Sequence, residues 1–140
     1  MIWAGLAVIV VAGAFWLGTR TRSTAEVPPA GVVPAGFAAE VSVTEAVARR
    51  SAGAFILDVR QPEEWVEGHI PGSTLIPLGE LQSRVGEIPR DKEIVVVCRS
   101  GNRSQTGRDI LRRAGLTRAT SMAGGLREWT AEGHPTVRGQ

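Results

Sequence analysis

Two short apolar runs rich in β-branched residues place the strongest constraint on the fold of this chain. They occupy residues 55–59, interrupted only by Asp58, and residues 94–98. Runs of this length and composition are typical of strands that are covered on both faces. We therefore expect both runs to be inner strands of one sheet.

Helix-like stretches alternate with these runs and with two shorter candidate strands. Ser42 and Glu45 have capping-box spacing before a short helix, and the predicted elements are helices at 62–67, 78–85, 104–114 and 126–131 and short strands at 75–76 and 119–122. Alternation of this kind predicts an α/β fold with a mostly parallel central sheet and helices on both faces. Ligands of such sheets bind beyond the carboxyl ends of the strands, where Cys98 ends the second run.

The first 22 residues differ in character from the rest of the chain. Residues 2–18 are an unbroken apolar run that as a helix would reach ~25 Å, with Trp3 and Trp16 near its ends and Arg20 and Arg22 following. Aromatic residues at the headgroup level and flanking arginines are typical of a membrane anchor. We expect residues 1–22 to form one transmembrane helix of a single-pass protein of the cell membrane.

The side of the membrane follows from the flanking charges. Both arginines lie on the C-terminal flank, so the positive-inside rule favours a cytoplasmic globular part, with a periplasmic or other extracytoplasmic location as the alternative. A cleaved signal peptide, cut at the small residues 23–25, is the other interpretation of the run, but no basic residue precedes it. Residues 23–36 are rich in Pro and Gly and are predicted to be a linker.

Length and charge limit the remaining chain to one domain with no general affinity for nucleic acid. The chain has 140 residues, of which 37–138 are enough for one compact domain. The 16 basic residues include Arg20 and Arg22, which leaves 14 basic residues against 14 acidic residues after them. The positive excess is therefore confined to the N-terminal segment, and a phosphate-binding face is not expected.

The segment after the second run has the features of an anion-binding loop around a nucleophile. Cys98 is the only cysteine, so neither an internal disulfide nor a paired-cysteine metal site can form. Gly101 allows the loop to curl, which aims backbone N–H groups at one centre, and the following helix adds its positive end. Such surroundings lower a thiol pKa. The alternative for a single cysteine is a buried place in the core.

Four separated blocks, taken together, resemble the rhodanese-like (thiosulfate sulfurtransferase) domain family. They are Leu57-Asp58-Val59-Arg60 with Glu63-Glu64-Trp65, Gly68-His69-Ile70-Pro71-Gly72, the loop Cys98 to Ser104, and Gly124-Gly125 with Trp129. The resemblance covers roughly residues 41–137. It departs from the family pattern at Ser73, where alanine is usual.

The resemblance implies sulfur transfer through a persulfide on Cys98, without metal or organic cofactor. A small sulfur-containing anion such as thiosulfate would donate the sulfur, and cyanide or a thiol would accept it. The implied substrate-binding residues are those of the loop, namely Arg99, Ser100, Gly101, Asn102 and Arg103. Arg99 is favoured over Arg103 for the sulfonate end of the donor, and Ser104 is expected to be the helix N-cap.

Asp58 and Arg60 are expected to support the site from the neighbouring strand. Asp58 would accept hydrogen bonds from the loop, and Arg60 would pair with Glu64 or Glu67. His69 is expected to be a hydrogen-bonded structural residue, whereas Trp65 and Trp129 are interpreted as core aromatics. His134 has no evident role.

Two other functions remain as alternatives. Cysteine phosphatases and arsenate reductases hold oxyanions over a similar loop, but they place an arginine six residues after the cysteine, where this chain has Ser104. A membrane-tethered persulfide carrier or protein-binding module with little free turnover is the stronger alternative. Transfer to small acceptors, as opposed to a specific protein thiol, would separate an enzyme from a carrier.

Overall fold

The computed structural model describes residues 37–140. In this part of the chain the helices are α1 (Val43–Ser51), α2 (Pro62–Glu67), α3 (Leu78–Arg84), α4 (Asn102–Arg113) and α5 (Gly125–Ala131), with a short 3-10 turn at Val85–Glu87. The strands are β1 (Glu40–Val41), β2 (Phe55–Asp58), β3 (Thr74–Leu75), β4 (Ile94–Val97) and β5 (Ala119–Met122).

The five strands form one sheet, and every strand pair in it is parallel. The strand order is β1-β5-β4-β2-β3, so the two apolar runs lie side by side as the inner strands β2 and β4. All four residues of β4 are buried. The expected parallel α/β architecture is confirmed.

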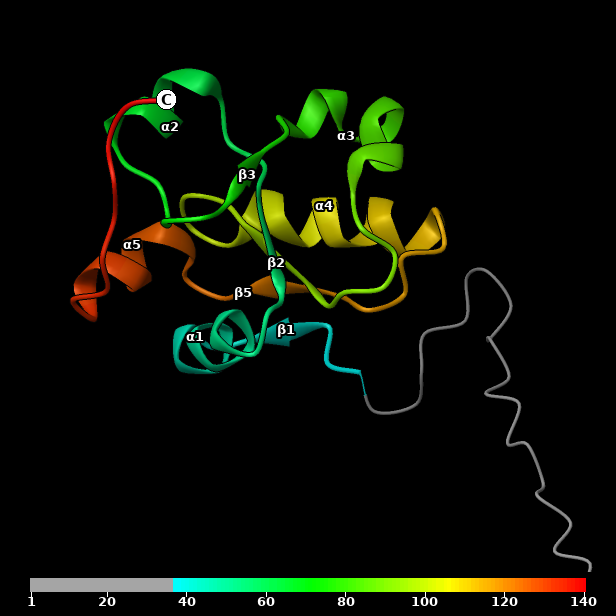
Figure 1. Cartoon of the computed structure of the whole chain (residues 1–140), viewed down its shortest axis with the longest axis horizontal. Helices are drawn as coiled ribbons and strands as arrows, with labels where there is room; N and C mark the ends of the chain where they lie inside the picture. Colours follow the sequence, from blue (N-terminus) through cyan, green and yellow to red (C-terminus); the bar gives the residue numbers. More distant parts are fainter. Residues whose placement is uncertain (1–36) are drawn as a thin grey trace, which may run out of the picture.

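Helices cover both faces of the sheet (Figure 1). On one face, alternate residues such as Leu57 and Val96 pack against Leu81 of α3 and Leu111 of α4. On the other face, Ile56 and Val95 belong to a second buried cluster that includes α1 and Trp129 of α5. The alternation of side chains along β2 and β4 thus divides the core into two layers.

Several element boundaries differ from the sequence-based expectations; β3, for example, covers Thr74–Leu75 rather than residues 75–76. β4 ends at Val97, so Cys98 is the first residue after the strand, and α4 begins at Asn102 rather than near Ser104. β1 was not expected. Its two residues pair with Ser121 and Met122 of β5, which extends the sheet by one edge strand.

The capping box predicted at the start of the first helix is present. The Ser42 hydroxyl accepts a hydrogen bond from the Glu45 amide at 3.2 Å, and the Glu45 carboxylate accepts one from the Ser42 amide at 2.8 Å. Because these contacts satisfy amides that the first turn leaves unpaired, they fix where α1 begins after β1.

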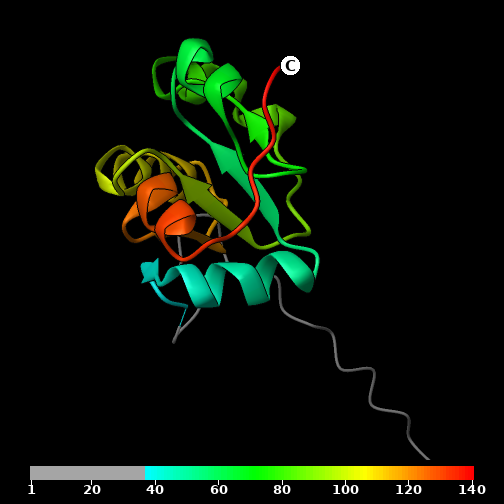
Figure 2. The same cartoon turned by 90° about the vertical axis from the view of Figure 1, so that its left-hand side faces the viewer.

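The C-terminal segment runs back from α5 to α2, as both views show (Figures 1 and 2). His69 and Val137 exchange backbone hydrogen bonds of 2.9 Å in an antiparallel bridge, and the Gly139 amide donates to the Val66 carbonyl at 3.0 Å. The indole of Trp129 donates to the Pro135 carbonyl at 2.9 Å. These contacts tie the end of the chain to the segment around His69.

The predicted transmembrane helix of residues 1–22 and the predicted linker of residues 23–36 lie outside the described residues. Within residues 37–140, no helix combines the length and the apolar character needed to cross a membrane.

Candidate functional site

Cys98 lies beyond the carboxyl end of β4, at the edge where parallel sheets place their ligands. Cys98 is buried, with only 1% of its surface exposed to solvent. The Gly101 amide donates to the Cys98 Sγ at 3.1 Å, and the thiol donates to the Ser104 Oγ at 3.6 Å. The loop therefore curls around the sulfur.

Gly101 makes this curl possible and is also the N-cap of α4. Its φ is 99°, in the left-handed region that favours glycine. The expectation that Ser104 is the N-cap was wrong. Ser104 lies inside the first turn, fully buried, and its hydroxyl donates to the Gly101 carbonyl at 2.7 Å. Ser104 thus braces the loop from within the helix and faces the sulfur.

The surroundings of Cys98 have opposing effects on its thiol pKa. Burial, the largest effect, raises the pKa because it disfavours the thiolate. Hydrogen bonding with the Ser104 hydroxyl and with the amides of Ser104, Ser100 and Gly101 together outweighs burial, so the net pKa of Cys98 is lowered. The site therefore increases the thiolate fraction at neutral pH.

The paired glycines at the start of α5, Gly124 and Gly125, hold the loop from the other side. The amides of Leu126 and Arg127 donate to the carbonyls of Cys98 and Arg99 at 2.8 and 3.1 Å. Gly125 has a φ of 59°, and a Cβ built there would lie 2.5 Å from the Cys98 carbonyl oxygen. Only glycine fits this approach, which explains why the Gly124-Gly125 block accompanies the loop.

Arg103 is not free to bind a substrate anion in this structure. Its two terminal nitrogens donate to the Glu64 carboxylate of α2, each at 2.7 Å. The hydrogen bonds from Arg103 lower the pKa of Glu64 to about 2, against the opposing effect of burial. Sequence reasoning missed Glu64 as the partner of Arg103, although Glu64 is part of the first family-like block.

The other loop residues leave their side chains open to solvent. Arg99, Ser100 and Asn102 are exposed, and within the described residues none of their side chains makes a hydrogen bond to the protein. Arg99 therefore presents an uncommitted guanidinium beside Cys98, in contrast to Arg103.

The expected partners of Asp58 and Arg60 were wrong, because the two residues pair with each other. They are 1% and 3% exposed, and the Arg60 Nε and Nη2 donate to the Asp58 carboxylate at 3.0 and 2.7 Å. Arg60 also donates to the backbone carbonyls of Glu64 and Gly68 at 3.1 and 2.8 Å. The pair thus joins the end of β2 to α2 and to its C-cap Gly68, and among the described residues neither side chain hydrogen-bonds to the loop.

The expectations for the aromatic and histidine residues were largely met. His69 is structural: its Nδ1 lies 3.0 Å from the Trp65 carbonyl oxygen, and its ring stacks on Trp65 at 3.6 Å. Trp129 is a core residue at 2% exposed, whereas Trp65 is only partly buried. His134 lies 3.3 Å from Glu132 and against the ring of Trp129.

A cavity of about 270 Å³ adjoins the loop. Its walls come from α2, the loop, α5 and the C-terminal segment, through Arg60, Glu64, Glu67, Gly68, Arg99, Leu126, Arg127, Thr130 and Thr136. Sequence reasoning missed Arg127 and the threonines because they lie outside the loop motif. Their closeness to Arg99 follows only from the way α5 meets the loop.

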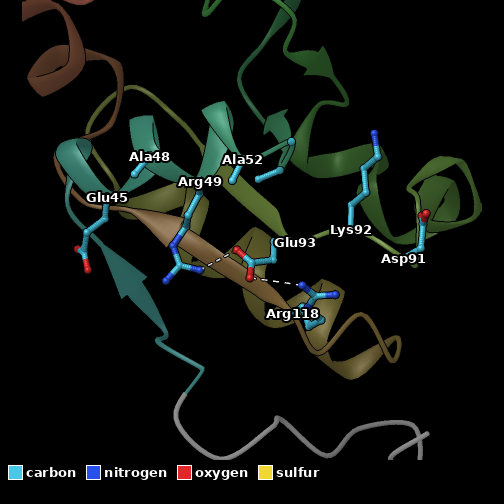
Figure 3. A pocket seen from close by; sticks show the side chains of 10 residues that line it. Glu45, Ala48, Arg49, Ala52, Asp91, Lys92, Glu93 and Arg118 are labelled. Atoms are coloured by element: carbon cyan, nitrogen blue, oxygen red, sulfur yellow. Dashed lines mark hydrogen bonds and ion pairs between the residues drawn. The ribbon is translucent and has the colours of Figure 1, made fainter. Parts of the chain in front are cut away.

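A larger hollow of about 830 Å³ lies at the opposite end of the sheet (Figure 3). It is lined by residues that precede β2, β4 and β5, at the amino ends of the parallel strands. Glu93 accepts hydrogen bonds there from Arg49 at 2.9 Å and from Arg118 at 3.3 Å. Cys98 does not line this hollow, which is not part of the Cys98 site. Nor does any cluster of three potential metal ligands occur in residues 37–140.

Comparison with known proteins assigns the family. The sequence model of the Rhodanese-like domain matches residues 42–132, which include the Cys98 loop and the paired glycines. The chain belongs to the rhodanese-like domain family. The rhodanese resemblance of the sequence blocks is thereby confirmed.

Relatives of this rhodanese-like chain include proteins named as a sulfurtransferase and as a putative sulfur carrier. "Thiosulfate sulfurtransferase GlpE" of Pseudomonas syringae is 35% identical over 96 residues, covering 68% of this chain and 91% of that protein. "Putative sulfur carrier protein YrkF" of Bacillus subtilis is 39% identical over 77 residues, covering 55% of this chain but only 42% of that protein.

A solved structure shares the fold over nearly its whole length. The rhodanese-related protein from Thermoplasma volcanium superposes with a TM-score of 0.67 at 33% identity, covering 71% of this chain and 98% of that one. These likenesses assign the chain to a family of sulfurtransferases and sulfur carriers.

Proposed function

We propose that this protein is a sulfurtransferase that moves sulfane sulfur from a donor such as thiosulfate to a thiophilic acceptor through a persulfide on Cys98. The observation that carries the proposal is the environment of the Cys98 Sγ. The Gly101 amide donates a hydrogen bond to this sulfur at 3.1 Å, and the pKa of the thiol is lowered. A thiolate with amides directed at it is both a nucleophile and the centre of an anion-binding loop.

In the first step the Cys98 thiolate attacks the outer sulfur of thiosulfate. A bond forms between Sγ and that sulfur, the S–S bond of thiosulfate breaks, and sulfite leaves with the electron pair. The persulfide anion on Cys98 replaces the thiolate, so the amides of the loop face a negative charge before and after the step. Arg99, exposed and uncommitted, is the proposed partner of the sulfonate end.

In the second step cyanide or a thiolate attacks the outer sulfur of the persulfide. The new bond forms to that sulfur, the persulfide S–S bond breaks, and the Cys98 thiolate is regenerated. The products are thiocyanate or a small persulfide. The sulfane sulfur passes from donor to acceptor without a change of oxidation level, and Cys98 ends the cycle as the thiolate with which it began, so the cycle needs no external oxidant or reductant.

A persulfide carrier with little free turnover is the second candidate. Two observations favour it: the likeness to the carrier-named YrkF, and the low exposure of Cys98, which is 1%. A carrier would load sulfur on Cys98 as an enzyme does but release it only to a particular protein thiol.

Intact mass spectrometry of the full chain after exposure to thiosulfate tests the proposal. We expect the gain of one sulfur atom on Cys98, reversed by cyanide with release of thiocyanate and absent in Cys98→Ser. No sulfur gained from thiosulfate or other sulfane donors, in a protein shown to be folded by circular dichroism, would refute the proposal. Loading without turnover on cyanide or small thiols would select the carrier.

We also propose that residues 1–22 anchor the protein in the cell membrane as a single helix, with the catalytic domain in the cytoplasm. The apolar run of residues 2–18 and the arginines at 20 and 22 support this. Labelling of Cys98→Ser variants carrying one new surface cysteine, with a thiol reagent that does not cross membranes, tests the orientation. Labelling in intact cells would place the domain outside the cytoplasm.

A further inference from the structure

Two arginines without acidic partners line the cavity beside the Cys98 loop. Arg99 comes from the loop and Arg127 from α5, and neither guanidinium donates a hydrogen bond within the described residues. We propose that this cavity binds the sulfur acceptor, and that the acceptor is a small thiol carrying a carboxylate, held by Arg127 together with Arg99. The inference rests on the proposed sulfur transfer through Cys98.

The cavity lies beside the Cys98 loop, which contributes Arg99 to its walls. Its wall residue Leu126 donates its amide to the Cys98 carbonyl at 2.8 Å, and the Arg127 amide donates to the Arg99 carbonyl at 3.1 Å. These bonds set α5 directly against the loop. The outer sulfur of a persulfide would stand about 2 Å beyond Sγ, within the same loop.

The charges of the cavity favour an anion. Of the charged groups in its walls, Arg60 is paired with Asp58, and Glu64 with Arg103. Arg99, Arg127 and Glu67 are left without an ion pair among the described residues, which is an excess of one positive charge. Guanidinium groups bind carboxylates through forked hydrogen bonds, and two of them facing one cavity suit such a group.

The size of the cavity favours an organic acceptor over an inorganic anion. Its volume of about 270 Å³ is close to the lower end of small-molecule sites, ~300 Å³. The hydroxyl of Thr136 and the side chain of Leu126 add polar and apolar walls. A thiol with a short carbon chain and a carboxylate could contact the cationic, polar and apolar walls of the cavity. The donor anion, by contrast, is bound by the amides of the loop.

The transfer step itself is unchanged by this assignment. The acceptor thiolate attacks the outer sulfur of the Cys98 persulfide, the persulfide S–S bond breaks, and the electron pair returns to Sγ as thiolate. The carboxylate takes no part in bond making. Arg127 is therefore a specificity-determining residue that places the thiolate and is not itself reactive.

Two acceptors of equal chain length test the assignment on the full-length protein. 3-Mercaptopropionate carries a carboxylate, and 3-mercapto-1-propanol carries a hydroxyl in its place. We expect the wild-type protein to prefer the acid in kcat/KM. Arg127→Gln is expected to reduce this preference about tenfold, mainly through KM, because a charge-assisted hydrogen bond is lost. Arg90→Gln removes an exposed charge outside the cavity and is the matched control.

A binding measurement that needs no turnover separates this inference from the proposed function. 3-(Methylthio)propionate carries the carboxylate but cannot accept sulfur. We expect it to shift the amide resonances of Leu126 and Arg127 in wild-type protein and in Arg90→Gln, and not in Arg127→Gln. Shifts in a protein that never gains sulfur would show that the cavity binds carboxylates but would refute the proposed transfer and, with it, the role of the bound thiol as acceptor. Sulfur loading without any preference for the acid, or transfer to a protein thiol alone, would overturn the cavity assignment.

Discussion

Arg103 and Glu64 form a two-pronged ion pair, with both terminal nitrogens of the arginine 2.7 Å from the carboxylate oxygens. The arginine belongs to the α4 end of the Cys98 loop and the glutamate to α2. The positive charge of Arg103, which the loop motif suggests for binding a substrate anion, is thus already neutralised by Glu64 of α2. Among residues 37–140, Arg99 is left as the loop arginine without an ion pair.

Releasing Arg103 is therefore expected to strengthen binding of the donor. In Glu64→Gln the guanidinium loses its carboxylate and adds a positive charge beside Cys98. We expect the KM for thiosulfate to fall about two- to fivefold, the range that follows from the energy of a partly exposed charge contact. Steady-state kinetics with cyanide as acceptor measure it, and Glu63→Gln, an exposed neighbour on α2, is the control. An unchanged KM in Glu64→Gln would mean that Arg103 stays away from the donor.

The same ion pair predicts a pH dependence of stability. The pKa of Glu64 is about 2 in the folded protein, against ~4.3 in an unfolded chain. A lowered carboxyl pKa stabilises the fold above the unfolded value, and the stabilisation is lost as the pH falls towards the folded value. We expect Glu64→Gln to lower the free energy of unfolding at pH 7 by about 1 kcal/mol, because the pair is partly exposed.

Urea titrations at several pH values measure this effect. The difference between wild type and Glu64→Gln should shrink between pH about 4.5 and pH 2, where Glu64 takes up its proton. A difference that stays constant over this interval would point to lost packing and not to charge. Glu63→Gln should show no such trend.

Ser104→Ala is expected to raise the thiol pKa of Cys98. The Ser104 hydroxyl is the strongest of the groups that lower this pKa against the opposing effect of burial. Its single proton points to the Gly101 carbonyl at 2.7 Å, so it must turn towards Sγ when the thiolate forms. Alkylation rates measured against pH should show a midpoint shifted upwards by about one unit, the size of a charge-assisted hydrogen bond.

The control for this prediction is Ser100→Ala, whose side chain is exposed and makes no hydrogen bond within the described residues. Ser100 acts on the sulfur through its backbone amide, which the substitution retains. A Ser104→Ala midpoint equal to that of Ser100→Ala would show that the hydroxyl does not stabilise the thiolate.

Two glycine substitutions separate backbone strain from the close contact at the loop. Gly125 and Gly133 both have left-handed φ angles, 59° and 80°. A Cβ at Gly125 would lie 2.5 Å from the Cys98 carbonyl oxygen, whereas one at Gly133 would meet nothing within 4 Å. Gly133→Ala should therefore cost about 1 kcal/mol of stability from conformation alone.

Gly125→Ala carries that same strain and must also displace the loop. We expect it to destabilise the fold by at least about 2 kcal/mol more than Gly133→Ala, and to reduce sulfur loading on Cys98 even where the protein remains folded. Thermal unfolding and intact mass after thiosulfate measure the two effects. Equal losses of stability in both variants would exclude the contact as the reason for the glycine.

The inner strands were predictable because their signal is local. A run such as Ile94–Val97 is apolar at every position, so it identifies a strand buried on both faces without knowledge of its neighbours. β1 has no such signal: Glu40 and Val41 become a strand only by pairing with β5, which lies far along the chain. This strand forms only because two distant segments pair, and such pairing leaves no local signal in the sequence of β1.

The site was predictable as a loop but not as a set of contacts. Cys98, Gly101 and the following helix could be recognised in order, since their relation depends on adjacent residues. The partners of Arg60 and Arg103 could not, because several carboxylates lie within a few residues of Arg60, whereas the partner of Arg103 lies 39 residues away, and only the packing of the folded chain selects among them. Ser104 was misassigned for a related reason: a left-handed glycine can cap a helix without a side-chain oxygen.

The pairing of β1 with β5 also has a consequence for biosynthesis. Glu40 and Val41 lie beside Ser121 and Met122, so one of the first strands to leave the ribosome has its partner among the last. Until residues 119–122 emerge, β1 has no neighbour and β4 exposes one hydrogen-bonding edge. A nascent chain stalled before that point is thus prone to aggregation through the exposed edge of β4. When β5 emerges and pairs with both β4 and β1, the long loop closes and this edge is covered.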